Sequence, residues 1–327
     1  MLNVTLAPPQ RHRSLTIFPL LAPDAPDLPY TLMSDALLRG SLRITELGSG
    51  TVPELLAING GESAVLVLDG EQLVGARQNR TTNRSLLLPA GSATRIPVSC
   101  MEQGRWHFES AHFRPAPHNS PATVRRQARE VEAGHVRVGV AMPPAALSAA
   151  QGRVWDAIAE HSEKLGARPE TGALNDLYAT RASDLDGWAG EYRSAPDQVG
   201  ILAFLGGRAL GMDVIGCRGL YARLHDRLVR GYVMDALGSA TRGRTVSGDA
   251  AQAYLDRVSA ARRVEAPTVG EGRYAVLAGK VIGGELTDPD RLVHLSAFPL
   301  DPRVRRVPGD VPPVDPIAPP SRRRRRS

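Results

Sequence analysis

Short apolar runs separated by Gly, Pro and Asn constrain the fold of this chain more than any other feature of its sequence. Between residues 15 and 113 these runs are LTIFPLL (15–21), GSLRITEL (40–47), SAVLVL (63–68), EQLVGA (71–76), SLLLPA (85–90), TRIPVSC (94–100) and RWHFES (105–110). Runs of this length bounded by turn residues are typical of β-strands. The dipeptide Asp69-Gly70 between two of them predicts a two-residue hairpin turn. The first 113 residues therefore predict a β-rich unit.

Patterns with a helical period dominate the rest of the chain. Ser120-Pro121 predicts the start of a helix through VRRQAREVEA, and Ser148-Ala-Ala-Gln151 is a capping-box pattern that predicts a second start. Further helices are predicted over 173–194, 218–238 and, behind Ser247, 248–261; strands are predicted over 199–205, 209–215, 273–278 and 291–298. The predicted class is α+β, with a β-rich N-terminal half packed against a mainly helical C-terminal half that has its own β-hairpin.

Three stretches share one pattern of an apolar strand, a turn and a second strand that reaches a glycine. They are AVLVLDGEQLVGA (64–76), GILAFLGGRALGM (200–212) and, more faintly, AVLAGKVIGGEL (275–286). Duplication of one hairpin and convergent hairpin chemistry both explain the similarity, and the sequence leaves both open.

The chain divides into three predicted segments. Residues 1–13 are polar and contain proline, and we expect them to be frayed. Residues 14–300 form the predicted α+β body, which is β-rich over 14–113 and helical with a hairpin over 120–300. Residues 301–327 form a predicted disordered tail that is rich in proline and ends in arginines.

The formal net charge of +6 is mostly a property of this tail. Arg322 to Arg326 supply five positive charges and leave +1 for the rest of the chain. Such a tip predicts weak, salt-dependent contact with polyanions, and a solvated tail without function is the alternative. No run of about 18 uncharged apolar residues is present, so no membrane span is predicted. Cys100 and Cys217 match no metal-ligand spacing and predict a reduced, cytoplasmic setting, with a single disulfide as the alternative.

Polar side chains gather between residues 69 and 106 beside the apolar runs. The predicted ligand-binding residues are Arg77, Gln78, Asn79, Arg80, Gln103, Arg105 and Trp106. A pair of guanidinium groups can bind a phosphate or a carboxylate bidentately, and amide groups can form hydrogen bonds to a neighbouring ring or ribose. The alternative is that the same side chains hold a loop by bonding to backbone carbonyls, with Trp106 packed in the core.

Two carboxylates of this region are the predicted catalytic pair. Glu102 beside Arg105 suits a general base, and Glu71 is its companion if their strands are neighbours. Structural ion pairing is the alternative for both. Cys100 ends an apolar strand, which favours a buried, inert thiol over a nucleophile.

Other constellations carry less chemistry. His107, Glu109, His112 and His118 lack a standard zinc or iron spacing, so no metal site is predicted. His294, within LVHLSAF, is predicted to be a core histidine with satisfied hydrogen bonds. The stretch GGRALG (206–211) lacks the spacing and the lysine of a phosphate-binding loop. The sequence indicates no cofactor and no particular protein partner.

Several motifs distributed over residues 12–300 carry a resemblance to a known family. They are LDGEQLVGARQNR (68–80), IPVSCMEQGRW (96–106), QGRVWDAI (151–158), TGALNDLY (171–178) and YVMDAL (232–237). The chain resembles the ARG and Rhodanese-Phosphatase-superfamily-associated Protein domain, a family of mostly uncharacterised prokaryotic proteins. The family name records association with ADP-ribosylglycohydrolases and with rhodanese- or phosphatase-type proteins. The resemblance therefore implies a role near ADP-ribose or nucleotide-phosphate chemistry, in conflict or repair systems, and it transfers no catalytic residue.

The sequence thus predicts a cytoplasmic protein that binds a phosphate-bearing ligand of the nucleotide or ADP-ribose type. Hydrolysis of that ligand, with Glu71 or Glu102 as base, is left open, so the sequence does not decide whether the protein is an enzyme. The alternative is a non-catalytic protein-interaction module whose polar motifs are structural. Nucleic-acid binding through the arginine tail is a third hypothesis, as an accessory property.

Overall fold

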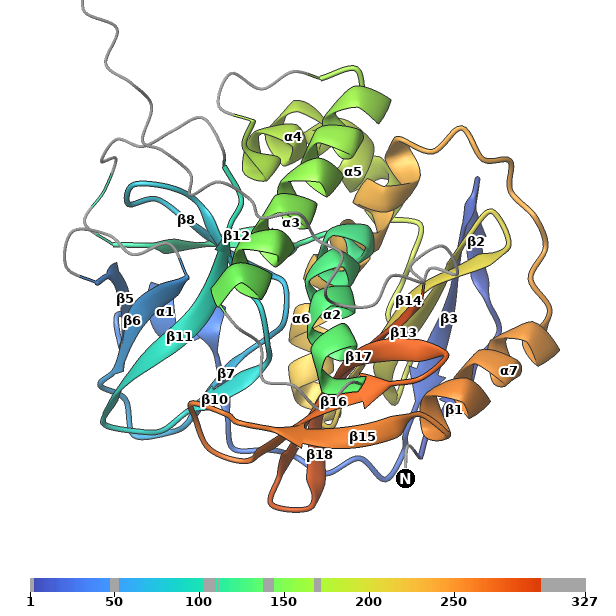
Figure 1. The fold of residues 1–327 in the computed structure, drawn as a ribbon. Coiled ribbons are helices and arrows are strands. Elements are labelled where there is room, and N and C mark those ends of the chain that lie inside the picture. Colours follow the sequence, from blue (N-terminus) through green and yellow to red (C-terminus); the bar gives the residue numbers. More distant parts are fainter. Residues whose placement is uncertain are drawn as a thin grey trace, which may run out of the picture.

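The computed structural model describes residues 3–47, 53–102, 110, 112–137, 144–167 and 172–300. Within these residues it contains seven helices and eighteen strands, which confirms the predicted α+β class. Strands precede and follow a central group of helices along the chain, and the helices stand between two strand-built regions in Figure 1.

A β-rich unit occupies residues 31–119 and lies to the left in Figure 1. One sheet has the order β12-β8-β9-β11-β6-β5, and a smaller one has the order β10-β7-β4. The bounds are β4 (Thr31–Leu32), α1 (Met33–Leu38), β5 (Leu42–Glu46), β6 (Glu54–Asn59), β7 (Val65–Val67), β8 (Glu71–Val74), β9 (Arg80–Thr82), β10 (Leu86–Leu88), β11 (Ser92–Cys100) and β12 (Arg114–Asn119). The unit has a core of its own, to which Ile44, Leu55 and Leu73 belong.

A larger antiparallel sheet collects strands from both ends of the described chain. Its order is β1-β3-β13-β14-β18-β17-β16-β15, and β2 also pairs with β3. The bounds are β1 (Thr5–Leu6), β2 (Gln10–His12), β3 (Leu15–Leu21), β13 (Gln198–Leu205), β14 (Arg208–Ile215), β15 (Arg262–Ala266), β16 (Arg273–Ala278), β17 (Val281–Asp288) and β18 (Arg291–Pro299). The run LTIFPLL is β3, and it pairs with β13 in this sheet rather than with the β-rich unit.

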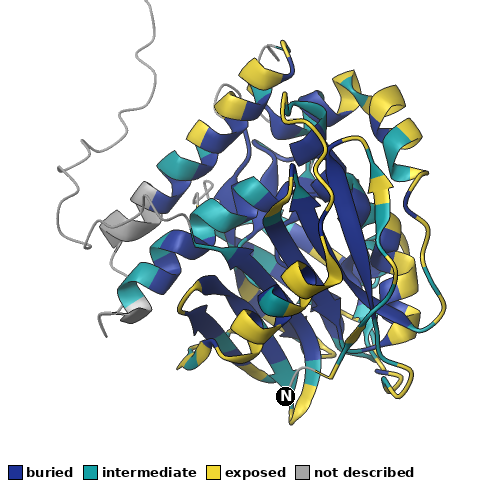
Figure 2. Ribbon diagram, turned by 90° about the vertical axis from the view of Figure 1, so that its right-hand side faces the viewer, coloured by how far each residue is buried: buried dark blue, intermediate teal, exposed yellow. Residues whose placement is uncertain are grey.

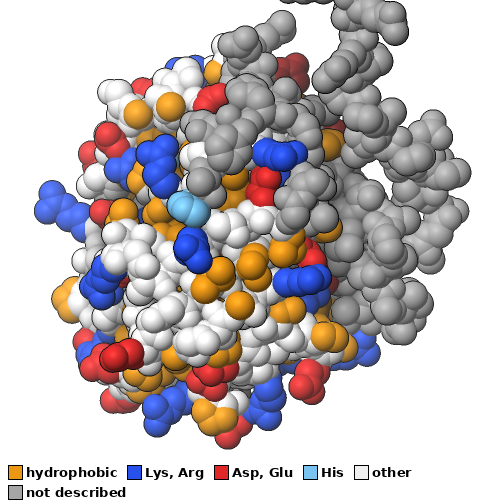
Figure 3. Space-filling view, turned by 90° about the vertical axis from the view of Figure 1, so that its left-hand side faces the viewer, with side chains coloured by type: hydrophobic (Ala, Val, Ile, Leu, Met, Phe, Trp, Pro, Cys, Tyr) orange, Lys and Arg blue, Asp and Glu red, His pale blue; other side chains and the backbone are white. Residues whose placement is uncertain are grey.

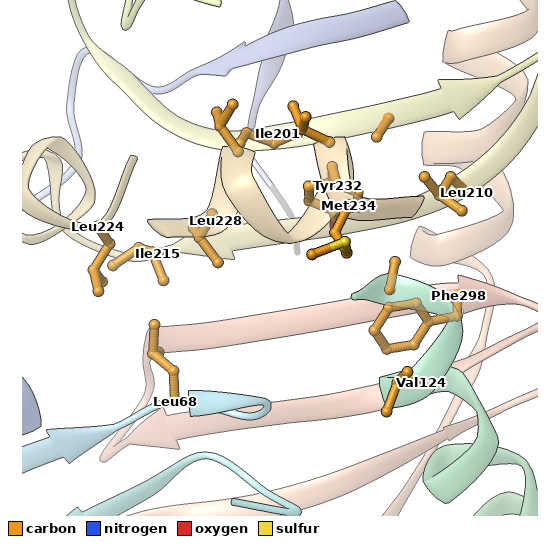
Figure 4. Packing of buried hydrophobic residues seen from close by; sticks show 14 of the residues in the cluster. Leu68, Val124, Ile201, Leu210, Ile215, Leu224, Leu228, Tyr232, Met234 and Phe298 are labelled. Carbon is orange, nitrogen blue, oxygen red and sulfur yellow. The ribbon is translucent and has the colours of Figure 1, made fainter. Parts of the chain in front are cut away.

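The remaining helices are α2 (Ala122–Arg137), α3 (Pro144–Lys164), α4 (Leu174–Thr180), α5 (Ala182–Ala189), α6 (Arg218–Leu237) and α7 (Gly248–Ser259). Of these, α2, α6 and α7 contact the large sheet, α3 lies on α2 and reaches β11, and α5 lies on α6. Leu228 and Tyr232 of α6 pack with Ile201 and Ile215 of the sheet in the main core, which Leu68 of the β-rich unit also joins (Figure 4). The central helices are therefore packed between the two regions and join them.

The opposite face of the large sheet has a second core under α7. Tyr254, Leu255 and Val258 of this helix pack against Phe18 and Leu202 of the sheet. Ser247 accepts a hydrogen bond from the Ala250 backbone N–H and caps the helix, as the sequence predicts. Figure 2 shows the strands of this sheet mostly buried and the outer surfaces of the helices exposed.

The Asp69-Gly70 hairpin prediction is wrong. Gly70 has a φ of +82° and the Glu71 N–H donates to the Leu68 carbonyl, so a tight turn exists. The strands on either side do not pair with each other, because β7 pairs with β10 and β4 whereas β8 pairs with β9 and β12. The turn instead carries the chain from one sheet to the next.

Two further predictions need correction. The helix expected to start at Ser148 begins at Pro144, which places Ser148 inside α3 rather than at its cap. The N-terminal segment expected to be frayed contributes β1 and β2, both hydrogen-bonded to β3. Of the three similar stretches, 200–212 and 275–286 are antiparallel hairpins of the large sheet, while 64–76 is not a hairpin.

Candidate functional site

Two segments of the polar motif meet where β9 lies beside the end of β11. Arg80 is the register partner of Cys100 in this antiparallel pair. The side chains of Gln78, Arg80 and Cys100 contact one another, and the backbone of Asn79 reaches Glu102. These five residues are called the Arg80 centre below.

The guanidinium of Arg80 is fully buried, with 0% of the residue exposed. Its Nη1 donates to Gln78 Oε1 at 3.0 Å and to Cys100 Sγ at 2.7 Å. Its Nε and Nη2 have no hydrogen-bond partner among the residues that the structure describes. Glu46 Oε1 lies 4.0 Å from Nη2, which is too long for a hydrogen bond. Because Nε and Nη2 form one side of the planar group, this edge can bind two oxygens of one anion.

The thiol of Cys100 is held in the same cluster. It donates to Gln78 Oε1 at 2.6 Å, while Gln78 Nε2 donates to the Glu102 carbonyl at 3.0 Å. Burial raises the pKa of Cys100 above its ordinary value, and Arg80 only partly opposes this effect. A thiol with a raised pKa is a poor nucleophile at neutral pH, so the geometry agrees with the predicted inert thiol.

Asn79 and Arg77 bond to neighbouring residues of the β-rich unit. Asn79 Oδ1 accepts from the Gly75 N–H at 3.1 Å, and the Asn79 N–H donates to Glu102 Oε2 at 3.1 Å. Arg77, with 37% of its side chain exposed, lies 3.4 Å from a Glu46 oxygen, and its backbone N–H donates to the same carboxylate. These contacts fix the loop that connects β8 to β9.

Helix α3 fastens the end of β11 through one glutamine. The side-chain amide of Gln151 accepts from the Cys100 N–H at 2.7 Å and donates to the Cys100 carbonyl at 2.8 Å. It thus satisfies both backbone groups of Cys100 where a neighbouring strand would otherwise do so. The position of α3 is therefore coupled to the backbone of the Arg80 centre.

Glu71 belongs to a different group of contacts. Its Oε2 accepts from the Leu68 N–H at 2.8 Å, and its Oε1 lies 3.5 Å from Arg227 Nη2 of α6. Burial raises the pKa of Glu71, and Arg227 lowers it in part. The contacts of Glu71 join the β-rich unit to α6 and do not join it to the Arg80 centre.

Some predicted residues lie outside the part of the chain that the structure describes. They are Gln103, Arg105 and Trp106, with His107 and Glu109, and the arginine tip Arg322 to Arg326. Their predicted roles stay predictions. His118 is described: it is buried and stacks face to face on Tyr178, with ring centroids 3.5 Å apart.

A second buried charged cluster, which the sequence analysis missed, lies where the β-rich unit, α2 and the large sheet meet. Arg125 of α2 donates to both oxygens of Asp213, at 2.9 and 2.6 Å, and to Asp69 Oδ2 at 3.4 Å. Burial alone would lower the pKa of Arg125, but Asp213 and Asp69 raise it above its ordinary value. This group, with Ser85 and His294, is called the Arg125 junction below.

The turn that carries Asp69 is shaped for this junction. A Cβ on Gly70 would lie 2.6 Å from Arg125 Cδ, so a side chain there would displace the arginine. Ser296 Oγ donates to Asp69 Oδ2 at 3.0 Å, and Tyr232 Oη donates to Asp213 Oδ2 at 2.6 Å. Burial would raise the pKa of Asp213, but Arg125 and His294 hold it below its ordinary value.

Ser85, His294 and Asp213 follow the order of a nucleophile, a base and an acid. Ser85 Oγ lies 2.5 Å from His294 Nδ1, and His294 Nε2 lies 3.2 Å from Asp213 Oδ1. All three residues are buried, and the cavity beside the junction has a volume of about 10 Å³, roughly that of one water molecule. The three side chains satisfy one another's hydrogen bonds in the core, and the prediction of a satisfied core histidine at His294 agrees with these contacts.

Two sequence signals pointed toward the junction. Asp213 interrupts the apolar strand ALGMDVI, and Arg125 lies among the apolar positions of its helix. A charge on a buried face requires a partner. The partner itself could not be read from the sequence, because the two residues are 88 positions apart.

The surface of the β-rich unit shows mixed charge. In Figure 3, basic, acidic and apolar side chains are interspersed over the described part of this face, without an extended area of one sign. Within the described residues, no helix is both long and apolar enough to cross a membrane.

Fold and site together define an α+β protein with a buried arginine-centred cluster in its β-rich unit. The chain belongs to the family of the ARG and Rhodanese-Phosphatase-superfamily-associated Protein domain, whose model matches residues 3–298. This match confirms the resemblance seen in the sequence and covers the described strands and helices from β1 to β17 completely, and β18 nearly so. Neither a comparison with curated proteins nor one with solved structures found a match.

Proposed function

We propose that this protein binds a small phosphate-bearing molecule of the nucleotide or ADP-ribose type, and that Arg80 anchors its anionic group. One observation carries the proposal: the Nε and Nη2 edge of a fully buried guanidinium has no hydrogen-bond partner among the described residues. The family name, with its reference to rhodanese- and phosphatase-type proteins, supports the ligand class.

The energetics of burial favour a ligand over a purely structural role. A buried charge costs several kcal/mol, which hydrogen bonds to an amide and a thiol and a carboxylate at 4.0 Å without a hydrogen bond do not fully return. Arginine cannot release its proton to avoid this cost. A hydrophobic residue would fill the same space more favourably. A phosphate accepting from both Nε and Nη2 would supply the missing charge and both acceptors.

The neighbouring residues have defined parts in this proposal. Gln78 holds the guanidinium plane through its hydrogen bond to Nη1, and Arg77, Asn79, Gln103, Arg105 and Trp106 remain the proposed contacts to the rest of the ligand. If the ligand is hydrolysed, Glu102 is the preferred base, because it belongs to the Arg80 centre whereas Glu71 is held by Leu68 and Arg227. Since Arg80 is fully buried, the site must open before binding, and we expect association slower than about 10⁵ M⁻¹s⁻¹.

The test is a thermal-shift and titration panel on the full chain with ADP-ribose, NAD, AMP and inorganic phosphate. Saturation at about 100 times the dissociation constant should add roughly 2.7 kcal/mol of stability. Arg80→Met should abolish the shifts produced by ADP-ribose and NAD, while Arg95→Met, which removes an exposed arginine from β11, should not. A panel without any shift, or an ADP-ribose or NAD shift that Arg80→Met leaves intact, would refute the proposal.

A second candidate function is a non-catalytic interaction module in which the same polar residues are structural. The observation that favours it is that Gln78, Asn79 and Glu102 already bond to their own chain. On this alternative, Glu102→Ala should lower the melting temperature by several degrees and leave every ligand shift unchanged. On the proposed function, Glu102→Ala should weaken ligand binding at nearly constant stability.

The location of the protein in the cell and its contact with polyanions are also proposals. Cys100 and Cys217 are both free, which supports the predicted cytoplasmic location. Contact of the arginine tip with polyanions also remains a proposal, which deletion of residues 318–327 tests through binding to DNA at low salt.

A further inference from the structure

A second concave site lies far along the chain from the Arg80 centre and shares no residue with it. It is an open groove of about 510 Å³ between the β2–β3 turn, the α5 helix and the segment that follows α6. Arg13 and Ser14 come from the turn, Trp188 comes from α5, and Arg242 comes from the segment after α6. This volume is within the range of sites that bind small organic molecules.

The charge of this groove is one-sided. None of its described lining residues is Asp or Glu, whereas two of them are arginines. Neither Arg13 nor Arg242 has an ion-pair partner among the described residues, although other arginines of the surface, such as Arg218 and Arg273, pair with nearby aspartates. The hydroxyl-bearing residues Ser14, Ser239 and Thr241 also belong to its lining. Guanidinium and hydroxyl donors without acidic neighbours form an environment that favours an anion.

The position of Arg13 is built into the fold. Its backbone has a φ of +50°, a left-handed conformation that is uncommon for a residue with a side chain. Its guanidinium lies over the indole of Trp188 at 4.9 Å from the ring centroid, and His12 packs edge-on to the same ring at 5.0 Å. The stacked indole thus orients the guanidinium and leaves its N–H groups available for an anion.

The opposite wall approaches this turn closely. A Cβ on Gly243 would lie 2.2 Å from the Arg13 carbonyl oxygen, so only glycine permits this contact. The contact brings the neighbouring Arg242 to the same groove as Arg13, across a separation of more than 200 residues in the sequence. The backbone therefore brings two arginines without ion pairs among the described residues to the lining of one groove.

We infer that this groove binds a small molecule that carries a phosphate monoester, with Arg13 and Arg242 as the two cationic contacts. The groove is larger than an inorganic phosphate requires, so the organic part of the ligand also fits inside it. The inference shares the ligand class of the proposed function but does not depend on it, because the two sites have no residue in common.

The experiment is a calorimetric titration of AMP into the full chain carrying Arg80→Met, in which the Arg80 centre cannot anchor an anion, and into further variants of that chain. Arg13→Met/Arg242→Met should weaken AMP binding by about tenfold or more, since each lost charge-assisted contact contributes about that much. The matched control Arg218→Met/Arg273→Met removes the same charge from arginines that pair with aspartates elsewhere, and it should change affinity by less than about twofold. Trp188→Leu, which frees Arg13 without removing it, should weaken binding at an unchanged melting temperature.

Any of the following outcomes would reject the inference. Absence of AMP binding, equal losses in the groove variant and its control, or equal binding of succinate would exclude a phosphate-monoester site. Binding of a single-stranded oligonucleotide much tighter than AMP and sensitive to Arg242→Met would identify a nucleic-acid surface instead. If the Arg80→Met chain does not bind AMP, the groove inference fails; the Arg80 proposal is decided separately, by whether Arg80→Met removes the shifts produced by ADP-ribose and NAD.

Discussion

The Arg80 centre and the Arg125 junction each bury an arginine, but they differ in the groups that accept hydrogen bonds from its guanidinium. Arg125 donates to three carboxylate oxygens of Asp213 and Asp69, and only its Nε lacks a partner among the described residues. Arg80 donates to an amide and a thiol and leaves both Nε and Nη2 unpaired. In the first case two carboxylates bond directly to the guanidinium, and in the second the nearest carboxylate, Glu46, lies 4.0 Å from Nη2 and makes no hydrogen bond to it. The difference separates an arginine that holds the fold together from one that is available to an anion from outside.

The largest effect should come from breaking the paired arginine. Arg125→Met leaves the buried Asp213 without an arginine partner and Asp69 with Arg129 alone, at 3.6 Å, so the free energy of unfolding should fall by about 3–5 kcal/mol in urea titrations. The double change Arg125→Met/Asp213→Leu should recover part of this loss, because it removes one of the stranded charges. A loss below about 1 kcal/mol for the single variant would show that the junction does not hold the units together.

His118 is a third buried group that can carry a positive charge, and the pH dependence of stability extends the comparison to it. His118 is flanked by Arg227 and Arg230, and burial, with these arginines, lowers its pKa from 6.5 to about 3. Unlike arginine it can stay neutral when folded, so between these two pH values the unfolded chain binds the extra proton. Stability is therefore complete above pH 6.5 and falls as the pH decreases toward 3.

The corresponding variant is His118→Phe, which keeps an aromatic ring against Tyr178. Between pH 6.5 and 4.5 the wild-type chain should lose about 1.4 kcal/mol per pH unit relative to the variant. Urea midpoints at pH 7.0, 5.5 and 4.5 measure this difference. Parallel pH profiles of the two proteins would mean that His118 is protonated as readily in the fold as in the unfolded chain.

A smaller effect is expected at the carboxylate nearest to the open edge of Arg80. Glu46 is engaged with Arg77 and lies 4.0 Å from Arg80 Nη2, so its charge competes with an incoming anion. Glu46→Gln should tighten phosphate-ligand binding by roughly fivefold, or about 1 kcal/mol. Weaker binding in a calorimetric titration would instead show that Glu46 positions Arg80 and is itself part of the site.

The smallest effect on stability should be that of Arg80→Met, even though Arg80 is the more deeply buried arginine. Because the carboxylate beside Arg80, that of Glu46, lies 4.0 Å away and also pairs with Arg77, removing the Arg80 charge should leave the free energy of unfolding within about 0.5 kcal/mol of wild type, or raise it. Measured beside Arg125→Met in the same urea series, it compares the two arginines directly. A loss above about 2 kcal/mol would assign Arg80 a structural role and favour the interaction module.

Local signals in the sequence were sufficient for much of the fold. The glycine pair at 206–207 marked the β13–β14 hairpin, the four-residue period through Leu220, Leu224 and Leu228 marked α6, and Ser247 marked the start of α7. Each of these features depends on residues close to one another in the chain. The convergence of residues 78–80 with 100–102 is of the same kind, because β9 and β11 lie close in sequence.

Features that depend on distant partners could not be predicted in this way. Asp69-Gly70 has the composition of a hairpin turn, but pairing is decided by β10 and β12, which compete for the flanking strands. Glu71 looked like a companion of Glu102, yet Arg227 of α6 lies next to it. The groove near Arg13 has no sequence motif, because its walls come from three separate parts of the chain.

The pairing of β3 with β13 has a consequence for synthesis on the ribosome. β3 ends at Leu21, and β13, the strand that pairs with it along its whole length, ends at Leu205. Most of the chain must therefore be synthesised before β13 can cover β3. At about 5–20 residues per second this interval is on the order of ten seconds or more. During that time LTIFPLL is an uncharged apolar segment paired only with the short strands β1 and β2, and Pro19 is the residue within it that opposes aggregation. The N-terminal end is therefore the part of the nascent chain most prone to aggregation. This risk ends when the complete protein is released, not when its first half has folded.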